Sequence, residues 1–496
     1  MFSSPFTWLA VAGTIVYLVV SYRSTPAPLP PGPKPKFITG NLHQLPKTER
    51  WKTYKEWSNT YGPMYMYRVF GRKVIILNTF KTINDLLDGR SNLYSDRPRS
   101  WMYTEIVGRK FSVFSVSSQS PRHKIYRKLL HSGLNARAIN GYYNLMEQEV
   151  RTLANNLISS PSNFVDHFRQ NAGAIILQLA YGWTVTGTRD RFVVLMEEAF
   201  LLNSELTAPG KWLVDVFPFL RFVPSWFPGG SFKIKAEEFK RELLAVDKIP
   251  FDWAKKEINS GNYIPSFTSQ HLLPEDGHKL DVEEEDILKW TSSALYVGGA
   301  DTTVAFMTAF IAAMTLWPSA QKKARQEVDK IIGARKPLFT DQASMPYISA
   351  LIKEVLRWAP PAPMGLPHCV TQDEIYSDYF IPKDTIIFAN IWGVSREEDI
   401  YPNPEEFDPE RYLGPSPQMD PRKFVFGFGR RLCPGAAFAE ASVFINVTSL
   451  LSQFTISKAI DTNGAEIIPN IEFTNTVTSH IKPFPCSIKP RTDKVA

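Results

Sequence analysis

The sequence predicts a mainly α-helical protein with small β-sheets, preceded by one N-terminal transmembrane helix. Helix-type spacing of apolar residues dominates from Lys81 to about Ile381. Strand-like stretches flank that region, at 63–78 and at 379–388. The first 22 residues carry no charged side chain. A helical body with small sheets towards both ends is an α-rich architecture with mixed additions.

The N-terminal segment is long and apolar enough to cross a membrane. Residues Phe6–Val20 are nearly all apolar, and a membrane-spanning helix needs about 20 such residues. A cleaved signal peptide is the alternative, but the segment has no basic start and no small-residue cleavage signal. Positive charge follows it, at Arg23, Lys34 and Lys36. The positive-inside rule therefore predicts an anchor at 1–22, with the body of the protein in the cytosol.

A proline-rich segment separates this anchor from the body. Residues 26–35 read Pro-Ala-Pro-Leu-Pro-Pro-Gly-Pro-Lys-Pro. Such a segment cannot form a helix and is expected to behave as a stiff, extended spacer. The chain is therefore divided into an anchor (1–22), a proline-rich hinge (23–36) and one large domain (37–496).

The composition is that of a folded protein from a reducing compartment. Of 496 residues, 44% are hydrophobic and 21% are charged, which excludes a disordered chain. The three cysteines are odd in number and widely spaced, so a disulfide framework is not expected. The net charge of +7 comes with no long basic run, and nucleic-acid binding is therefore not expected.

Local patterns predict strands at three places. Residues Pro63–Asn78 are expected to form two short strands around a turn at Gly71. Residues Tyr379–Phe388 are expected to form paired strands around a Pro-Lys-Asp turn, and the tail, 473–490, is irregular and strand-prone. The segment Lys211–Phe232 is rich in aromatic residues and is interrupted by Pro-Gly-Gly. It predicts either core packing or, as the favoured interpretation, contact with the membrane.

The most informative motif is Phe-Gly-Phe-Gly-Arg-Arg-Leu-Cys-Pro-Gly at 426–435, where a loop leads into an apolar helix. Cys433 is its only strong metal ligand. The loop glycines remove side chains where the backbone turns sharply or approaches something flat. The positive potential of the helix N-terminus favours a thiolate, and Arg431 can reach an anionic group beside a metal. The alternative is a buried structural cysteine in a glycine-rich turn.

A second motif lies in a long helix predicted at Glu285–Trp317. Gly298 and Gly299 stand in its middle, where each glycine costs about 1 kcal/mol relative to alanine. A flat cofactor that approaches closely would explain them. Asp301 and Thr302 follow directly and could relay protons to a bound guest. The alternative is a solvated pair on a core helix.

A third helix places an acid and a base, Glu354 and Arg357, at i and i+3 on one face, where they can pair. The spacing alone carries little information. Its neighbourhood strengthens it, because Trp-Ala-Pro-Pro-Ala-Pro follows directly and Phe-Asp-Pro-Glu-Arg-Tyr stands downstream at 407–412.

These strings resemble the signatures of the cytochromes P450, the haem-thiolate monooxygenases. The cysteine loop reads Phe-x-x-Gly-x-Arg-x-Cys-x-Gly, and the helix motif reads Gly-Gly-x-Asp-Thr-Thr. The resemblance implies the cytochrome P450 fold, with haem b as the cofactor and Cys433 as its axial iron ligand. Phe426 and Gly435 would then belong to the haem-binding loop. Asp301 and Thr302 would be the catalytic proton relay.

The same resemblance implies roles for charged residues around the cofactor. Glu354, Arg357 and Arg411 would form a buried ion network behind the haem. The haem carboxylates need cationic or donor partners. The matching positions are Arg431, His368 and Arg127, with His123 at a position where the family usually has tryptophan.

The implied enzyme uses electrons from NADPH-cytochrome reductase to insert one oxygen atom of O2 into a hydrophobic small molecule. Anchor and hinge resemble those of microsomal members, which implies the endoplasmic reticulum membrane with a cytosolic catalytic domain (37–496). The details are most similar to fungal oxidases of secondary metabolism. The expected substrate pocket combines apolar and small residues: Phe114, Ala294, Gly298, Ala300, Met364 and Val477.

Two other functions stay open at this level. A haem-thiolate isomerase or dehydratase would use the same fold without O2 or a reductase, but it would not need both Asp301 and Thr302. A non-catalytic membrane haem protein would need a second strong iron ligand opposite Cys433, and the segment around Gly298 offers none.

The electron donor is expected to dock on the face behind Cys433. The fold is expected to bring basic residues from two segments together there: Lys124, Lys128, Arg422, Lys423 and Arg430. An acidic flavin domain that approaches such a patch gains association rate from electrostatic steering. The alternative is an ordinary solvated basic surface.

Overall fold

The computed structural model describes residues 13–14, 26–208 and 210–492. The predicted transmembrane helix at 1–22 lies outside these residues except for 13 and 14, so it stays a prediction. In the described part of the chain, helix α13 (Val282–Leu316) is long and apolar enough to cross a membrane. However, 72% of its most apolar stretch is buried inside the protein, as expected of a core helix.

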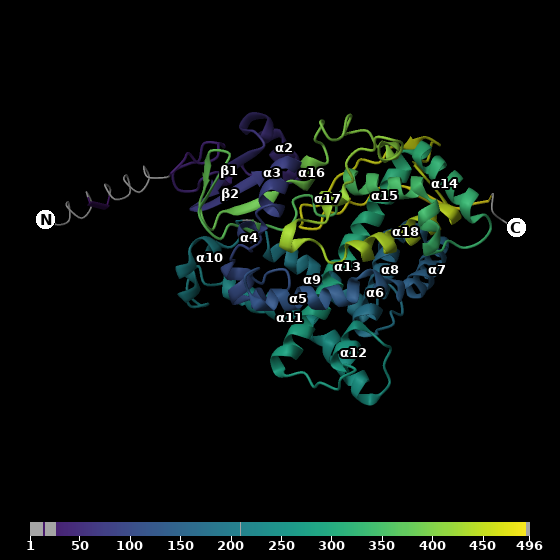
Figure 1. Cartoon of the computed structure of the whole chain (residues 1–496), viewed down its shortest axis with the longest axis horizontal. Coiled ribbons are helices and arrows are strands. Elements are labelled where there is room, and N and C mark those ends of the chain that lie inside the picture. The colour runs from purple at the N-terminus through teal and green to yellow at the C-terminus, as the bar shows by residue number, and fades with distance from the viewer. Residues whose placement is uncertain (1–12, 15–25, 209, 493–496) are drawn as a thin grey trace.

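Helix α13 runs through the middle of the body (Figure 1). It begins three residues before the expected start because Asp281 caps it. The Asp281 carboxylate accepts the N–H groups of Glu283 and Glu284, and the Glu284 carboxylate accepts the N–H of Asp281. This reciprocal capping box satisfies donors that a helix N-terminus otherwise leaves unpaired.

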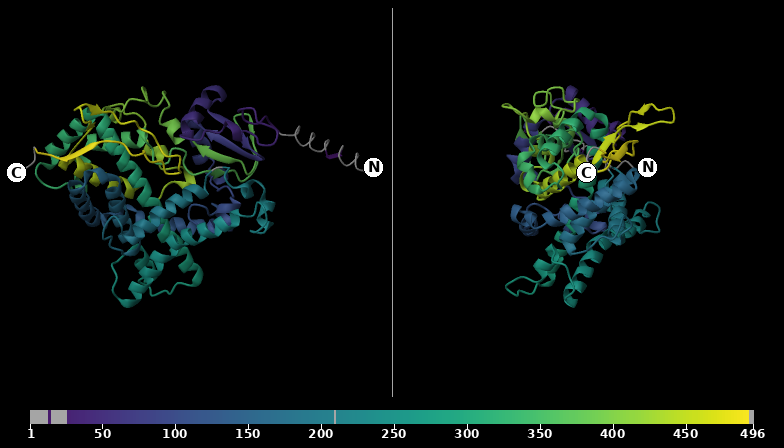
Figure 2. Two further views of the ribbon diagram at one scale, coloured as in Figure 1. Left: turned by 180° about the vertical axis from the view of Figure 1, so that it is seen from behind. Right: turned by 90° about the vertical axis from the view of Figure 1, so that its right-hand side faces the viewer.

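Four helices make the most extensive contacts with α13. They are α8 (Phe164–Tyr181), α5 (Pro121–Leu134), α11 (Phe232–Ser260) and α18 (Ala436–Gln453). Helix α5 begins with Ser120 as its cap and Pro121 in its first turn. The mainly helical body predicted from the sequence is confirmed, and two further views of it are given in Figure 2.

The remaining α-helices complete this body. In chain order they are α2 (Arg50–Tyr61), α3 (Phe80–Ile83), α4 (Ser91–Tyr94), α6 (Ala136–Asn140), α7 (Tyr143–Ser159), α9 (Arg191–Leu206), α10 (Leu213–Val216), α12 (Phe267–Leu272), α14 (Pro318–Ile332), α15 (Pro346–Trp358), α16 (Ile391–Val394) and α17 (Arg422–Val425).

The main sheet lies at the N-terminal end of the long axis (Figure 1). Strands β1 (Met64–Val69) and β2 (Arg72–Leu77) form the antiparallel hairpin that was predicted around Gly71. Strand β6 (Ile386–Ala389) pairs with β2 in parallel, and β3 (His368–Cys369) closes the order β1-β2-β6-β3. The sheet therefore joins the two strand-prone regions that flank the helical part of the sequence.

One predicted pairing is wrong. The strands on either side of the Pro-Lys-Asp turn do not pair with each other. Strand β5 (Tyr379–Ile381) pairs with β4 (Glu374–Tyr376) in a separate small sheet, whereas β6 joins the main sheet. The turn itself forms, because the Thr385 N–H donates to the Pro382 carbonyl at 3.2 Å. It directs the chain from one sheet to another, since β2 offers β6 a longer apolar partner than β5 does.

The C-terminal tail is irregular with short strands, as expected. Strand β7 (Phe454–Ser457) pairs with β10 (Ser487–Pro490), and β8 (Ala459–Ile460) pairs with β9 (Glu466–Ile467). Between them, an isolated bridge joins Phe473 to Ile481 and closes a loop.

The described part of the proline-rich hinge is extended but not free-standing. The Met66 N–H donates to the Pro31 carbonyl at 2.8 Å, and the Phe380 N–H donates to the Pro28 carbonyl at 2.8 Å. A Cβ on Gly32 would lie 1.9 Å from the Met66 carbonyl oxygen, so only glycine allows this approach. The spacer interpretation is therefore corrected for residues 28–33, which are docked onto the two sheets.

The aromatic segment at 211–232 is divided between the two alternatives: Trp212, Leu220 and Phe232 pack against the main core, whereas the middle of the segment is exposed. The fractional exposures of Phe219, Phe222 and Trp226 are 64%, 72% and 80%. The ring of Phe217 contacts Phe70, at the tip of the β1–β2 hairpin. The exposed residues Phe37 and Ile38 precede β1 in the chain and add further apolar surface.

Candidate functional site

The loop at 426–435 is a tight backbone structure that ends at Cys433. The Cys433 N–H donates to the Phe426 carbonyl at 2.7 Å, and helix α18 starts three residues after the cysteine, with Gly435 as its N-cap. Gly429 has a φ of 52°, and a Cβ there would lie 2.5 Å from the Leu87 carbonyl oxygen. This glycine is therefore required by packing within the protein, and a flat guest is not needed to explain it.

The electrostatics of Cys433 combine opposing effects. Burial raises the pKa of the Cys433 thiol, and this is the largest effect. The Gly435 N–H and the Arg127 guanidinium both lower that pKa, as the position before a helix predicts. Because burial outweighs them, the helix N-terminus alone does not produce a thiolate. A cation bound at the sulfur would supply the missing stabilisation.

Arginines from three segments meet near this loop. Arg431 donates through Nε to the Ser95 carbonyl at 2.9 Å and through Nη2 to the Val116 carbonyl. Arg127, on α5, donates to the Leu432 carbonyl at 2.6 Å. Burial lowers the pKa of both groups, that of Arg431 to about 10. Both side chains are partly exposed, and guanidinium groups that are only partly solvated suit the binding of an anion.

Arg97 belongs to the same cluster and was missed in the sequence. It donates through Nε to the Phe114 carbonyl at 3.0 Å and through Nη1 to the Pro367 carbonyl at 2.6 Å. Burial and the nearby charge of Arg431 lower its pKa to about 9. Arg97 stands in the irregular stretch Asp-Arg-Pro-Arg, which has no periodicity and no family motif to single it out.

Both predicted histidines lie beside these arginines. Burial, followed by the charge of Arg97, lowers the pKa of His368 to about 3. Burial, followed by the charge of Arg431, lowers the pKa of His123 to about 4. The Nδ1–H of His368 donates to the Tyr94 carbonyl at 2.6 Å, whereas the His123 ring has no hydrogen-bonding partner among the described residues.

The cluster fits a flat group with two carboxylates. Asp96 raises the pKa values of Arg97 and Arg431, so it balances part of their charge. The Ser95 hydroxyl is buried and has no hydrogen-bonding partner in the part of the chain that the structure describes. Arg97 and Arg431 therefore leave an excess of positive charge beside the cysteine loop, and the Ser95 hydroxyl is a donor without a partner there. Both features suit the binding of anionic groups.

The two glycines of the α13 motif have different surroundings, so they are explained differently. A Cβ on Gly299 would lie 3.0 Å from the Ile176 side chain of α8, so this glycine serves helix packing. A Cβ on Gly298 would have the Phe114 ring at 3.8 Å and no closer neighbour. The expectation that both glycines admit a flat cofactor is therefore corrected to Gly298 alone.

After its first two turns, helix α13 is largely buried except around this motif. Residues 297–299 and the pair Asp301 and Thr302 are partly exposed, although helices pack on several sides of α13. The Thr302 hydroxyl donates to the Gly298 carbonyl at 2.9 Å. This bond fixes the hydroxyl on the partly exposed face, where its oxygen can still accept a hydrogen bond.

Asp301 has a partner that the sequence did not reveal. The His480 Nε2 lies 2.8 Å from Oδ1 of Asp301. His480 comes from the C-terminal loop closed by the Phe473–Ile481 bridge. No local pattern could have found this pair, because the two residues are far apart in the sequence.

The remaining predicted pocket residues are only partly brought together. The Phe114 ring is the nearest neighbour of the side of Gly298 that has no side chain. Ala294 and Ala300 lie on the same helix as Gly298, and each is 8% exposed. Val477 is exposed in the loop that carries His480. Met364 instead packs in a buried cluster with Trp51, Tyr54, Tyr65 and Ile76, so it supports the sheet.

Glu354 is the centre of a fully buried ion network. Its carboxylate accepts both Nε and Nη2 of Arg357 at 2.8 Å, and Nε of Arg411 at 3.2 Å. It also accepts the Asp408 N–H at 2.8 Å and the Tyr412 hydroxyl at 3.1 Å. The structure thus brings together the three residues that the resemblance linked.

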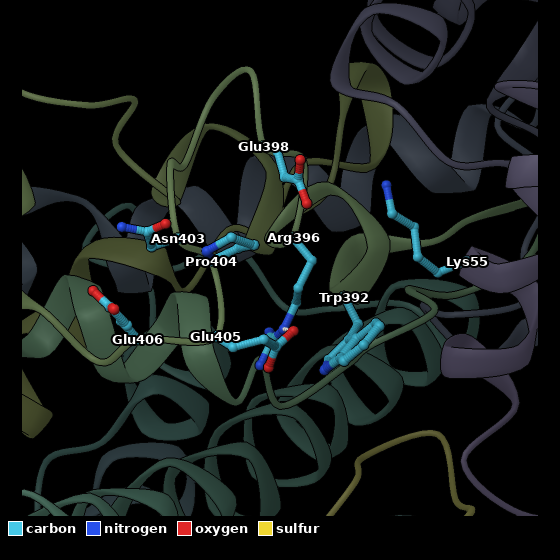
Figure 3. Close-up of a pocket in the computed structure, with 8 residues that line it drawn as sticks. All are labelled: Lys55, Trp392, Arg396, Glu398, Asn403, Pro404, Glu405 and Glu406. Carbon is cyan, nitrogen blue, oxygen red and sulfur yellow. Dashed lines mark ion pairs between the residues drawn. The ribbon is translucent and has the colours of Figure 1, made fainter.

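A surface pocket of about 450 Å³ lies elsewhere (Figure 3). It is lined by none of the predicted site residues, and among its lining residues Arg396 forms an ion pair with Glu405 at 3.5 Å. The Arg396 guanidinium carbon lies 4.4 Å from the centroid of the Trp392 ring. This pocket has no connection to the cysteine loop and is not the candidate site.

The predicted basic face is partly neutralised. Arg422 forms ion pairs with Asp420 at 2.6 Å and with Glu440 at 2.8 Å, so it contributes little net charge. Lys124, Lys128, Lys423 and Arg430 are exposed, and no ion pair joins them to the described residues. Arg430 lies near α5, since its charge lowers the pKa of His123.

Comparisons with known proteins agree on one family. A family model described as Cytochrome P450 matches residues 30–484. Cytochrome P450 monooxygenase claR of Ampulloclitocybe clavipes is 40% identical over 492 residues, which cover 98% of this chain and 90% of the relative. Cytochrome P450 monooxygenase 208 of Postia placenta is 39% identical, over 96% of this chain and 94% of the relative. Cytochrome P450 monooxygenase ppsD of Aspergillus oryzae is 37% identical, over 93% and 89%.

Proposed function

Because the chain belongs to the cytochrome P450 family, whose members bind haem b through a cysteine thiolate, we propose that it is a reductase-dependent monooxygenase. It takes electrons from NADPH-cytochrome reductase and inserts one oxygen atom of O2 into a hydrophobic small molecule. Its relatives are fungal monooxygenases, and the proposed substrate comes from fungal secondary metabolism. The observation that carries the proposal is the position of Cys433 beside a partly exposed cluster of arginines.

Cys433 is the proposed axial ligand, and the arginines are proposed to hold the two haem carboxylates. Arg431, Arg97 and Arg127 offer partly exposed guanidinium donors, which suit carboxylates better than any single ammonium group. His123 can donate from its unpartnered ring. His368 already donates its Nδ1–H to Tyr94, so it can help only through Nε2.

Bound haem supplies the activation of O2, and the chain supplies orientation, dryness and protons. Thr302 is proposed to present its hydroxyl oxygen as an acceptor and, in exchange with its bond to Gly298, as a donor. Asp301 is proposed to hold the proton that Thr302 passes on. Retention of both residues favours monooxygenation over a haem-thiolate isomerase or dehydratase, which needs no proton relay.

Carbon monoxide difference spectra test the ligand assignment. Cys433→Ala should abolish the red-shifted Soret band of the ferrous–CO complex, because no other described cysteine lies in the loop at 426–435. The matched controls are Cys369→Ala and Cys486→Ala, and both should retain the band. A thiolate-type spectrum in Cys433→Ala would overturn the assignment.

The proposed location is the endoplasmic reticulum membrane, with residues 1–22 as a single-pass anchor and the catalytic domain, 37–496, in the cytosol. The exposed aromatic segment at 211–232 and residues Phe37 and Ile38 support a second contact with lipid. Deletion of residues 1–22 should release part of the protein from carbonate-washed membranes without loss of haem. If Phe222 and Trp226 are then changed to Ser, release should become complete; unchanged retention would contradict lipid contact by this segment.

A further inference from the structure

Asp301, the acid of the proposed relay, is hydrogen-bonded to a histidine from the other end of the chain. The His480 Nε2 lies 2.8 Å from Asp301 Oδ1, and the two side chains are 22% and 20% exposed. A carboxylate only accepts hydrogen bonds, so the shared hydrogen is on Nε2. Nδ1 of His480 has no partner among the residues that the structure describes, and it is the ring's second proton-exchange position.

The backbone around His480 fixes the position of the ring. The Thr474 N–H donates to the His480 carbonyl at 2.8 Å, and the His480 N–H donates to the Thr474 hydroxyl at 2.9 Å. The adjacent Ser479 N–H donates to the Pro361 carbonyl at 2.8 Å. These hydrogen bonds hold the backbone of residues 479 and 480 in place, and this backbone carries the His480 ring.

The pair differs from an incidental surface contact. His278 also meets a carboxylate, that of Glu284, with 2.9 Å between Nε2 and Oε2. That pair is about half exposed and joins residues six positions apart at the start of α13. The Asp301 pair instead joins the middle of α13 to a C-terminal loop, so the fold has to bring the two side chains together.

We propose that His480 positions Asp301 and supplies its protons. This inference rests on the proposed function of Asp301 in oxygen activation. One proton enters the ring at Nδ1 from a solvent acid, hydronium or buffer, and one leaves Nε2 for Oδ1 of Asp301. The ring stays neutral, Asp301 becomes a carboxylic acid that can donate, and no other co-reactant is required.

The loop that carries His480 also carries a residue of the predicted substrate pocket. Val477, a predicted pocket residue, precedes His480 by three positions in the same loop. The Ser479 bond to Pro361 ties the loop to the segment that follows α15. A substrate that packs against Val477 would therefore contact the loop that holds His480.

The first experiment tests the pair without any turnover. The full-length holoprotein is treated with diethyl pyrocarbonate, and carbethoxylation of each histidine is measured by peptide mass spectrometry. His480 should react slowly in the native protein and several-fold faster in Asp301→Ala, because its Nε2 is then free. His278 should react equally in both proteins. An unchanged His480 rate in Asp301→Ala would overturn the pair.

The second experiment tests proton supply. Purified holoprotein, NADPH-cytochrome reductase and dodecanoic acid as a fixed hydrophobic probe are combined, and NADPH oxidation is followed in H2O and D2O. His480→Gln and His480→Leu should each be about tenfold slower, below the full effect of a positioned acid because Asp301 remains. Their solvent isotope effects should rise, because proton delivery becomes limiting.

His480→Gln is the decisive variant, since its amide can still donate to Asp301 but cannot pass a proton through. His278→Gln is the matched control and should behave as the native protein. A native rate and a native isotope effect in His480→Gln would overturn the proposal. The ferrous–CO band, recorded for every variant, separates this outcome from a failure of the proposed haem-thiolate function, which would remove the band from the native protein.

Discussion

Replacement of Glu354 by alanine should destabilise the haem-bound protein severely. The carboxylate accepts five hydrogen bonds, from Arg357 (two), Arg411, Asp408 and Tyr412. The side chains of Glu354 and Arg357 are fully buried, and that of Arg411 is 2% exposed. The alanine variant therefore leaves two buried guanidinium groups without their counter-charge.

The expected loss follows from that geometry. Removal of one partner of a buried ion pair typically costs 3–5 kcal/mol, out of a total unfolding free energy of about 5–15 kcal/mol. The main-chain carbonyls of Ser395, Pro404 and Glu406 still accept from Arg357, so its donors stay satisfied while its charge does not. For a chain of this length the unfolding entropy is about 1 kcal/mol per kelvin, so this loss should lower the midpoint of thermal inactivation by about 3–5 °C.

The assay is retention of the ferrous–CO band after heating for a fixed time, with haem content measured in parallel. Glu472→Ala is the matched control, because Glu472 pairs with Lys482 at 2.7 Å on the surface, with both side chains about half exposed. Exposed pairs contribute only about 0–1 kcal/mol, so this variant should stay close to the native midpoint. If Glu354→Ala shifts the midpoint no more than Glu472→Ala, the network is not the structural centre that its geometry indicates.

Three further outcomes are expected. Thr302→Ala should consume NADPH and O2 but release hydrogen peroxide in place of oxygenated product, and an unchanged product yield per NADPH would count against the relay. Joint reversal of Lys128 and Arg430 to Glu should slow the first electron transfer and flatten its salt dependence while substrate-induced spectral shifts persist; equal reduction rates at low salt would place the reductase elsewhere. Gly299→Ala should destabilise by about 1–3 kcal/mol through its contact with Ile176, whereas Gly298→Ala should fold normally and alter only ligand-induced spectra; equal midpoints for the two variants would refute the packing argument.

The sequence was most informative where the chemistry is local. The cysteine loop and the hairpin around Gly71 depend on neighbours within a few residues, so residue type and spacing were sufficient. Even there, spacing did not give the reasons for the glycines. Gly299 and Gly429 avoid collisions with Ile176 and with the backbone at Leu87, and both contacts come from distant segments.

Only the tertiary structure decided which distant groups meet. The two strands beside the Pro-Lys-Asp turn separate into different sheets because β2 competes for β6. Arg97 lies near Arg431 because its guanidinium donates to the carbonyls of Phe114 and Pro367. His480 reaches Asp301 through a loop that Pro361 fixes in place. Local sequence encodes backbone preference and motif chemistry, but a hydrogen bond between remote segments depends on the packing of the whole core, which no single segment specifies.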